Sequence, residues 1–355
     1  FGCLNYLIIF ISLATLVIKE GASDLHLSAG RSPVLRVSGF LTELSDSPTS
    51  KEEMKGFLSE LLPRHALAEF ETKKEADFAW SFKDEARFRG NAFVQQNGIS
   101  VALRLIPKTI RSVADLNLPV QLQDFARKTQ GFFLVVGPVG QGKTTTLAAL
   151  IELINSERAE HIITIEDPIE YIFEPKKSII DQREVKVNTG SFPSALQAMF
   201  REDVDVVMVG EMRDTETIST AVTAAETGHL VFSTLHTNDA AQTIDRVIDS
   251  FPASQQDQIR LQLSSSLLGI FSQRLIPRIS GGLIPAYELL INNSAVSNLI
   301  RERRTHEINT VIETGMEQGM IDLNRSLAEL VRKGEITVVN AHLYSSDSKI
   351  LDRYL

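Results

Sequence analysis

Four short, uninterrupted apolar runs most constrain the fold of this chain. They read FFLVVG, HIITIE, VDVVMVG and HLVFSTL, and stretches of helical character separate them. Strands buried on both faces of a parallel sheet have this continuous apolar texture, whereas half-buried antiparallel strands alternate. We therefore expect a parallel α/β sheet in this part of the chain.

The region before these runs has a different texture. Residues 23–39 alternate apolar positions with turn residues, which predicts a hairpin, and a helical stretch follows from Lys51 to Leu62. Three strand-like runs come next, DFAWSF, ARFRGNAFVQ and ISVALRLIP. This order favours a small α+β domain with an antiparallel sheet over residues 1–107. We expect a linker over 108–119, a helix over 120–129 and a second domain over 120–355.

The region after Phe251 is predicted to be mostly helical. QLSSSLLGIFSQRL and DLNRSLAELVRKG both place apolar residues at helical period. We therefore expect the second domain to end in a helical part over about residues 256–355.

The apolar N-terminal stretch, residues 1–18, has three interpretations. It is about as long as a short membrane crossing, but it lacks a basic start and a small-residue cleavage site, so a secretory signal fits poorly. The first interpretation is a helix packed on its own domain, and the second is a membrane-associated segment. The third is a fragmentary or misassigned start, since the chain begins with Phe1.

Composition excludes several classes of protein. The only cysteine is Cys3, which excludes a disulfide framework and a four-cysteine zinc site within these 355 residues and fits a reducing compartment. The net charge of −9 weighs against a nucleic-acid partner, which requires a basic surface.

The sequence GPVGQGKT, between an apolar run and a helical stretch, predicts a phosphate-binding loop (P-loop). Its glycines let backbone N–H groups wrap a phosphate, and the following helix N-terminus adds a favourable dipole. Lys143 is expected to reach the β- and γ-phosphates, and the Thr144 hydroxyl to bind Mg²⁺. The expected ligand is therefore a nucleoside triphosphate with Mg²⁺, bound by Gly137, Pro138, Val139, Gly140, Gln141, Gly142, Lys143, Thr144 and Thr145.

Hydrolysis also needs a carboxylate that positions water and supports the metal ion. Glu166 ends one apolar run, and Glu211 follows another after a glycine. Ligands of open α/β sheets bind beyond the carboxyl ends of the strands, so both acids are expected near the P-loop. His229 and His236 flank a third run and are candidates to contact the γ-phosphate.

These motifs resemble those of the secretion-superfamily ATPases. GPVGQGKT, HIITIEDPIEY, VDVVMVGEMRD and AAETGHLVFSTLHTNDAAQTIDRVIDSFP are similar, in order and spacing, to the family's Walker A, Asp box, Walker B and His box. GASDLHLSAGRSPVLRVSG and ARFRGNAFVQ resemble the family's smaller domain. Within the superfamily, the chain most resembles the type IV pilus retraction ATPases, from about Gly21 onward.

The resemblance implies a RecA-like P-loop NTPase domain, preceded by a PAS-like α+β domain and carrying C-terminal helices. It implies a homo-hexamer that binds ATP between the two domains of a subunit. It also implies a cytoplasmic motor, peripheral at the inner face of the cytoplasmic membrane, which acts through a membrane platform protein to retract the fibre in twitching motility. A paralogous retraction ATPase is a further implied partner.

The same resemblance implies roles for individual residues. Glu211 is the Walker B acid and Glu166 the Asp-box acid, with Mg²⁺ held by Thr144, Glu166 and Glu211, partly through water. Which of the two acids activates the attacking water stays open, and we favour Glu211. His229 is the implied sensor of the γ-phosphate. Arg104, ahead of Arg87 and Arg89, is the implied arginine that neutralises charge during phosphoryl transfer.

Some positions depart from the family pattern. Val139 and Gln141 stand where Thr and Ser are usual, and Val296 and Ser297 interrupt the Ala-Ile-Arg of the C-terminal motif. The second departure leaves open an accessory paralogue of the retraction motor. An assembly or secretion motor is another alternative, although such enzymes usually carry a four-cysteine insertion, and a DNA translocase fits poorly with the acidic composition.

Overall fold

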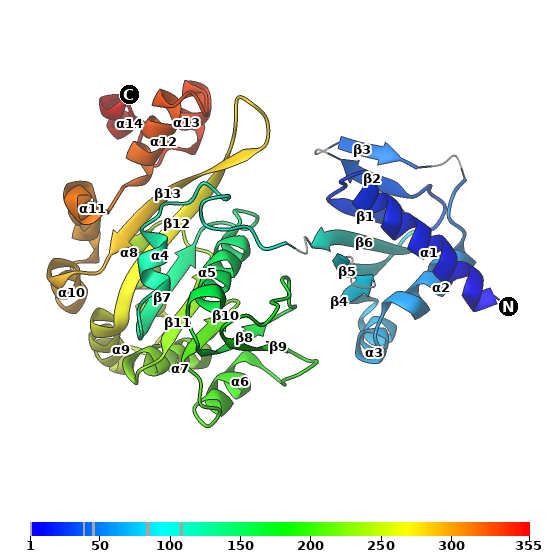
Figure 1. Ribbon diagram of the computed structural model, residues 1–355, viewed down its shortest axis with the longest axis horizontal. Helices are drawn as coiled ribbons and strands as arrows, with labels where there is room; N and C mark the ends of the chain where they lie inside the picture. Colours follow the sequence, from blue (N-terminus) through cyan, green and yellow to red (C-terminus); the bar gives the residue numbers. More distant parts are fainter. Residues whose placement is uncertain (1, 38–39, 45–46, 83–85, 107–108) are drawn as a thin grey trace. The chain divides into compact units, whose positions relative to one another are not determined.

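The computed structural model describes the chain except for residues 1, 38–39, 45–46, 83–85 and 107–108. It forms two compact units (Figure 1). The first unit is the N-terminal part of the chain together with one short segment from the sequence of the second unit. The first unit is Phe1–Thr109 with Pro168–Ile172, and the second is Ile110–Asp167 with Phe173–Leu355.

The first unit is built on a six-stranded sheet in the order β3-β2-β1-β6-β5-β4, in which all neighbours pair antiparallel. The predicted hairpin and the three strand-like runs are confirmed, whereas β3 and α3 were not anticipated. The strands are β1 (Asp24–Ser28), β2 (Val34–Val37), β3 (Phe40–Glu43), β4 (Glu75–Phe82), β5 (Ala86–Gln95) and β6 (Gly98–Ile106). The helices are α1 (Gly2–Lys19), α2 (Lys51–Leu61) and α3 (Arg64–Lys73). Residues 107 and 108, where the predicted α+β domain meets the predicted linker, lie outside the described residues.

Helix α1 packs on its own unit, as the first interpretation of the apolar N-terminal stretch predicts. Phe10, Ala14 and Val17 are buried in the core of this unit. The Phe10 ring meets the Trp80 ring edge-on at a centroid distance of 4.8 Å and lies 6.0 Å from the Phe57 ring. The apolar character of α1 is therefore used in packing. No helix in the described part of the chain has the length and hydropathy that a membrane crossing requires.

The second unit contains a seven-stranded sheet in the order β13-β12-β7-β11-β10-β8-β9. Every neighbouring pair is parallel except β12 with β13, so the parallel sheet is confirmed. The four apolar runs form its centre as β7 (Gly131–Val136), β8 (His161–Glu166), β10 (Val206–Val209) and β11 (Leu230–Leu235). The remaining strands are β9 (Ile179–Glu184), β12 (Leu267–Pro277) and β13 (Leu283–Ile291).

Helices cover both faces of this sheet because alternate side chains of each strand point to opposite sides. On one face, the Phe125 ring of α4 (Leu122–Ala126) packs at a tilt against the Phe133 ring of β7 at a centroid distance of 4.3 Å, and α5 (Lys143–Glu157) lies beside α4. Phe132 and Leu134 point into the core on the other face. That core includes α6 (Phe192–Met199), α7 (Thr215–Glu226), α8 (Ala240–Asp249) and α9 (Ala253–Ser266). Helix α4 is shorter than the predicted helix over 120–129.

The prediction that the chain is mostly helical after Phe251 misses two strands, and the helix predicted over QLSSSLLGIFSQRL is wrong in its second half. Within QLSSSLLGIFSQRL, α9 ends at Ser266 and β12 begins at Leu267, and β13 follows antiparallel to it. Both strands are buried along most of their length. A fully buried strand and a buried helix give similar apolar runs, so periodicity alone could not separate them.

The chain does end in helices. Three of them, α12, α13 and α14, pack against the C-terminal end of β12 and the N-terminal end of β13. Ile276 and Ile284 share a small core with α12, α13 and α14. In α10, Val296 is fully buried and Ser297 donates to the Ser264 carbonyl at 2.8 Å, so the two unusual residues hold α10 against α9. The elements of this part are α10 (Ser294–Arg301), α11 (Ile308–Thr314), α12 (Leu323–Arg332), α13 (Val338–Tyr344) and α14 (Ser348–Tyr354), with short 3-10 turns at Thr305–Glu307 and Met316–Gln318.

Replacement of Phe10 by alanine should destabilise the first unit by about 3–5 kcal/mol, because it removes a ring that is only 1% exposed. Ile9→Ala is the matched control on the same helix, since Ile9 is 40% exposed and should change stability by no more than about 0.5 kcal/mol. Urea unfolding followed by the fluorescence of Trp80, the only tryptophan of the chain, reports on this unit. Equal midpoints for wild type and Phe10→Ala would contradict the packing of α1.

Candidate functional site

The P-loop connects the end of β7 to the start of α5. Three of its glycines adopt left-handed backbone conformations, with φ of 145° at Gly137, 78° at Gly140 and 80° at Gly142. Residues with a side chain rarely adopt these angles, which explains the glycine spacing of the motif. Gly142 precedes α5 without any side-chain cap, so the N-terminus of this helix is suited to bind an anion.

Lys143, the first residue of α5, is held inside its own loop. Its ammonium donates to the carbonyl oxygens of Gly137 at 2.8 Å and Pro138 at 2.9 Å, and the side chain is largely buried. Burial lowers the pKa of Lys143 to about 8, and the nearby Glu211 partly opposes this effect. A phosphate group at this position would supply the negative charge that two neutral carbonyls do not.

His236 joins Lys143 to Glu211 at the carboxyl ends of β11 and β10. The Nδ1 atom of His236 lies 3.2 Å from the Lys143 ammonium, and its Nε2 atom lies 3.8 Å from a Glu211 carboxylate oxygen. Because an ammonium only donates, Nδ1 must be the unprotonated acceptor, which assigns the remaining proton to Nε2, facing Glu211. Burial and the Lys143 charge lower the pKa of His236, consistent with a neutral ring. Glu211 also pairs with Arg213 at 2.8 Å.

Glu166 ends β8 at the same edge of the sheet. Its carboxylate is buried and accepts from the Thr164 hydroxyl at 2.7 Å and from the Gln182 amide at 3.4 Å. Glu166 is therefore held in place by donors on β8 and β9, whereas Glu211 is partly exposed and faces Lys143 through His236. This contrast favours Glu211 as the more available base and Glu166 as the more rigid acid.

The structure does not bring His229 to this cluster. His229 precedes β11, and its Nδ1 atom lies 3.1 Å from the Ala224 carbonyl oxygen while its ring packs edge-on against Phe200. A six-residue strand, roughly 17–20 Å long, separates it from the P-loop edge of the same sheet. Within this chain, His236 therefore takes the place beside the P-loop that was expected of His229.

The candidate arginines lie in the first unit, on strands β5 and β6. Arg104 donates to the Asp24 carboxylate at 2.9 Å and is mostly exposed, and Arg89 pairs with Glu170 at 3.0 Å. The charges of Arg89 and Arg104 are thus balanced by carboxylates within that unit. The role of Arg104 in phosphoryl transfer stays a prediction.

Sequence reasoning missed the residues that β12 brings to the P-loop. Gln273 contacts both Gln141 and Thr146, and Arg274 donates to Asn238, two residues after His236. The helix predicted over QLSSSLLGIFSQRL includes both residues and gives no reason to expect them next to the P-loop. A strand assignment for LLGIFSQRL would have given the signal.

Glu288 of β13 is a buried carboxylate behind the His236 loop. It accepts from the backbone N–H of Ala240, the first residue of α8, at 2.8 Å. Burial raises the pKa of Glu288 to about 7; Asp239 and Asp322 also raise it, whereas the Ala240 N–H and Arg274 lower it. The carboxyl therefore fixes the start of α8, just beyond the loop that carries His236.

Glu288→Gln should remove a pH dependence of stability. The folded protein keeps a proton on Glu288 up to about pH 7, whereas an unperturbed glutamate releases it near 4.5, so the stability due to this group is full below about 4.5 and lost as the pH rises through about 7. The full difference is about 3 kcal/mol. Glutamine stays neutral and keeps an acceptor for Ala240. Chemical unfolding followed by circular dichroism should show that the variant gains stability over wild type as the pH rises. Parallel curves would contradict the assignment.

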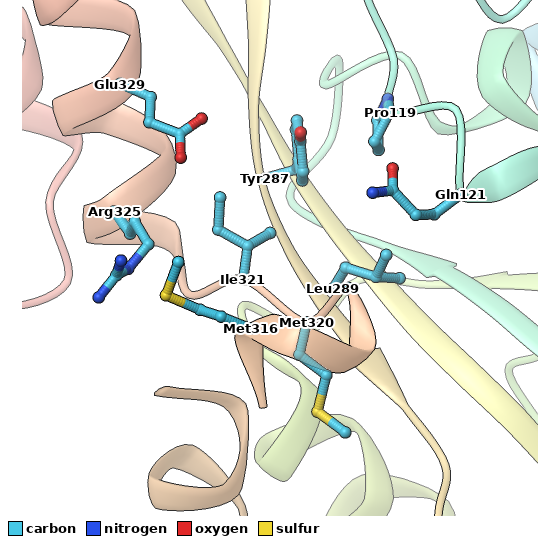
Figure 2. Close-up of a pocket in the computed structure, with 10 residues that line it drawn as sticks. Pro119, Gln121, Tyr287, Leu289, Met316, Met320, Ile321, Arg325 and Glu329 are labelled. Atoms are coloured by element: carbon cyan, nitrogen blue, oxygen red, sulfur yellow. The ribbon is translucent and has the colours of Figure 1, made fainter. Parts of the chain in front are cut away.

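A separate cavity of about 190 Å³ lies between α12, β13 and the start of α4 (Figure 2). Its described lining residues include Gln121, Tyr287, Arg325 and Glu329, and none belongs to the P-loop. Because none of its described lining residues belongs to the P-loop, the cavity is not the candidate nucleotide site.

The donor set at the P-loop fits Mg²⁺ carried by a nucleotide. No group of three His, Cys, Asp or Glu side chains that could hold a metal ion by itself is found in the part of the chain that the structure describes. Mg²⁺ usually takes only one or two protein ligands and completes its shell with phosphates and water. Thr144, in the first turn of α5, and the acids at the ends of β8 and β10 suit that arrangement.

Comparisons with known proteins agree with this geometry. A family model described as type II/IV secretion system protein matches residues 5–282. The type IV pilus retraction ATPase PilT of Pseudomonas aeruginosa is 44% identical over 323 residues, which cover 91% of this chain and 94% of that protein. The type IV pilus ATPase PilU of the same organism is 37% identical over 343 residues, which cover 96% and 90%.

A solved structure gives the same answer. The crystal structure of the pilus retraction motor PilT with bound ADP matches with a TM-score of 0.89 and 44% identity, covering 97% of this chain and 98% of that one. The RecA-like fold with a preceding α+β unit is thus shared along nearly the whole chain. The chain therefore belongs to the type II/IV secretion system protein family, in which it is a PilT-like ATPase.

Proposed function

We propose that this protein is the ATP-driven motor of type IV pilus retraction, acting as a homo-hexamer at the inner face of the cytoplasmic membrane. One observation carries the chemical part: Lys143, His236 and Glu211, from three different loops, form a contiguous cluster at one edge of the parallel sheet, with contacts of 3.2 and 3.8 Å. Retraction is supported by the 44% identity to PilT, a pilus retraction ATPase, and the lower identity to PilU favours the main motor over the accessory paralogue.

In the proposed reaction, the P-loop backbone and Lys143 bind the phosphates of ATP. Thr144 supports the Mg²⁺ ion that the nucleotide brings, which neutralises charge on the phosphates. Glu211 orients the attacking water. The neutral His236 links the Glu211 carboxylate to Lys143, so loss of the γ-phosphate changes the electrostatic potential at both Glu211 and Lys143. Glu166, fixed by Thr164, supports the metal or the water from the adjacent strand.

Hydrolysis becomes motion through differential affinity. A ligand shifts a conformational equilibrium only as far as it binds one state more tightly than the other. We infer that ATP favours a closed arrangement of the two units of a subunit and that product release favours an open one. A ring of subunits would pass this change to a membrane platform protein and so to the fibre.

Glu211→Gln should keep nucleotide binding and lose turnover by at least about a hundredfold, since removal of a general base commonly costs 10²–10⁴ in rate. Glu166→Gln, changed in the same way one strand away, is the matched comparison, and the acid whose loss lowers kcat further is the water-activating one. Lys143→Ala should weaken ADP binding itself. Calorimetric binding and steady-state ATPase assays measure both effects. Normal turnover in Glu211→Gln would refute its role, and normal ADP affinity in Lys143→Ala would refute the P-loop assignment.

Deletion of the gene in its host should leave cells with abundant surface pili that do not move by twitching. Complementation with wild type should restore movement, whereas Glu211→Gln should not. Pili are counted by electron microscopy and movement by the width of colony spreading. Cells without pili would identify an assembly motor instead. Cells with unchanged pili and movement would indicate an accessory paralogue or a role outside pili.

A further inference from the structure

Strand β12 extends past the end of β7 and runs beside the P-loop. The last pair of the β12–β7 ladder is Ser272 with Val136, after which β7 turns into the loop at Gly137. Strand β12 continues with Gln273, Arg274 and Leu275, still paired to β13 on its other side. Its loop-facing groups therefore lose the partner strand at the point where the P-loop begins.

Two glutamines replace the missing strand contacts. The Gln273 amide donates to the carbonyl oxygen of Gln141, and its own oxygen accepts from the Thr146 hydroxyl at 2.7 Å. In return, the Gln141 side-chain oxygen accepts from the backbone N–H of Leu275 at 2.6 Å. We call these four residues, Gln141, Thr146, Gln273 and Leu275, the glutamine clamp.

Gln273 and Thr146 of the glutamine clamp are buried and closely fitted. Gln273 is only 2% exposed, and its amide group is hydrogen-bonded at both ends. A Cβ atom on Gly142 would lie 3.1 Å from the Gln273 amide nitrogen, and one on Gly137 would lie 2.6 Å from the Gln273 carbonyl oxygen. The loop glycines thus permit both the left-handed backbone and the close approach of β12. Loss of the Gln273 amide would leave a buried hydroxyl and a loop carbonyl without their partner.

The residues on either side of Gln273 contact the loop that carries His236. Arg274 donates to the backbone and side-chain oxygens of Asn238, both at 3.0 Å, and the Ser272 hydroxyl donates to the same backbone oxygen at 2.8 Å. Asn238 lies two residues after His236. One segment of β12 therefore fixes the loop that carries Lys143 and the loop that carries His236 relative to each other.

We propose that Gln273 is a positioning residue of the nucleotide site, which holds the P-loop backbone in its phosphate-binding conformation through Gln141 and Thr146. The inference rests on the proposed nucleotide function and adds a specific residue to it. A loop that is ordered before the ligand arrives loses less freedom when it binds, so the glutamine clamp contributes to affinity without touching the nucleotide. Because the same strand leads to the C-terminal helices, it also ties the P-loop to that part of the unit.

The test compares Gln273→Met with Gln121→Met in the full chain. Both changes keep side-chain length and remove the amide, but Gln121 lines the cavity of Figure 2, away from the P-loop. We expect Gln273→Met to raise the Kd for ADP and the KM for ATP about tenfold, with kcat within about threefold of wild type. The reason is that the lost interaction stabilises the bound ground state and the transition state equally. Gln121→Met should leave all three quantities at wild-type values.

The outcomes separate the two proposals. If wild type does not bind ADP, the proposed function itself fails. If wild type binds ADP and Gln273→Met binds it equally well, the positioning role is wrong, even if the thermal midpoint falls. Should Gln273→Met not fold, Thr146→Val removes only the buried hydroxyl from which Gln273 accepts, and it should raise the Kd for ADP about threefold. Unchanged affinity in that variant would also overturn the inference.

Discussion

The parallel alignment of β7, β11, β10 and β8 decides where this protein can do chemistry. Parallel strands bring all their carboxyl ends to one edge, and each of the four is followed or ended by a polar residue of the candidate site. Residues far apart in sequence, from Lys143 to His236, meet there without any loop of unusual length. The other edge of the sheet receives residues such as His229, which the same alignment keeps away from the P-loop.

Strand β12 gives this edge a second support. It pairs with β7 inside the sheet, contacts the P-loop through Gln273 and reaches the small C-terminal core through Ile276. A hydrogen-bonded strand transmits displacement with little internal freedom. The P-loop edge and the C-terminal helices are therefore connected through a hydrogen-bonded strand as well as through loops.

Much of the fold could be predicted because its strands differ in texture. The apolar runs of β7, β8, β10 and β11 are uninterrupted since both faces are covered, and the glycines of the P-loop report its backbone angles directly. Strand β12 was not predicted, because LLGIFSQRL is buried on both faces and follows α9 directly, with no turn residue between them. His236 could have been preferred to His229 by the rule that selected Glu166 and Glu211, since only His236 follows its strand. The clamp contacts could not be predicted, because they depend on how far β12 extends beyond β7.

The carbonyl oxygens that surround Lys143 also bear on the speed of the catalytic cycle. In the proposed function, the Gly137 and Pro138 carbonyls give the ammonium an internal substitute for phosphate, and the lysine would exchange one set of acceptors for the other when a nucleotide binds or leaves. These competing acceptors lower the affinity for ADP. They also lower the barrier to its dissociation, because the buried ammonium keeps hydrogen-bond acceptors throughout. For a motor that repeats its cycle many times, rapid release of the nucleotide is more useful than a long residence time.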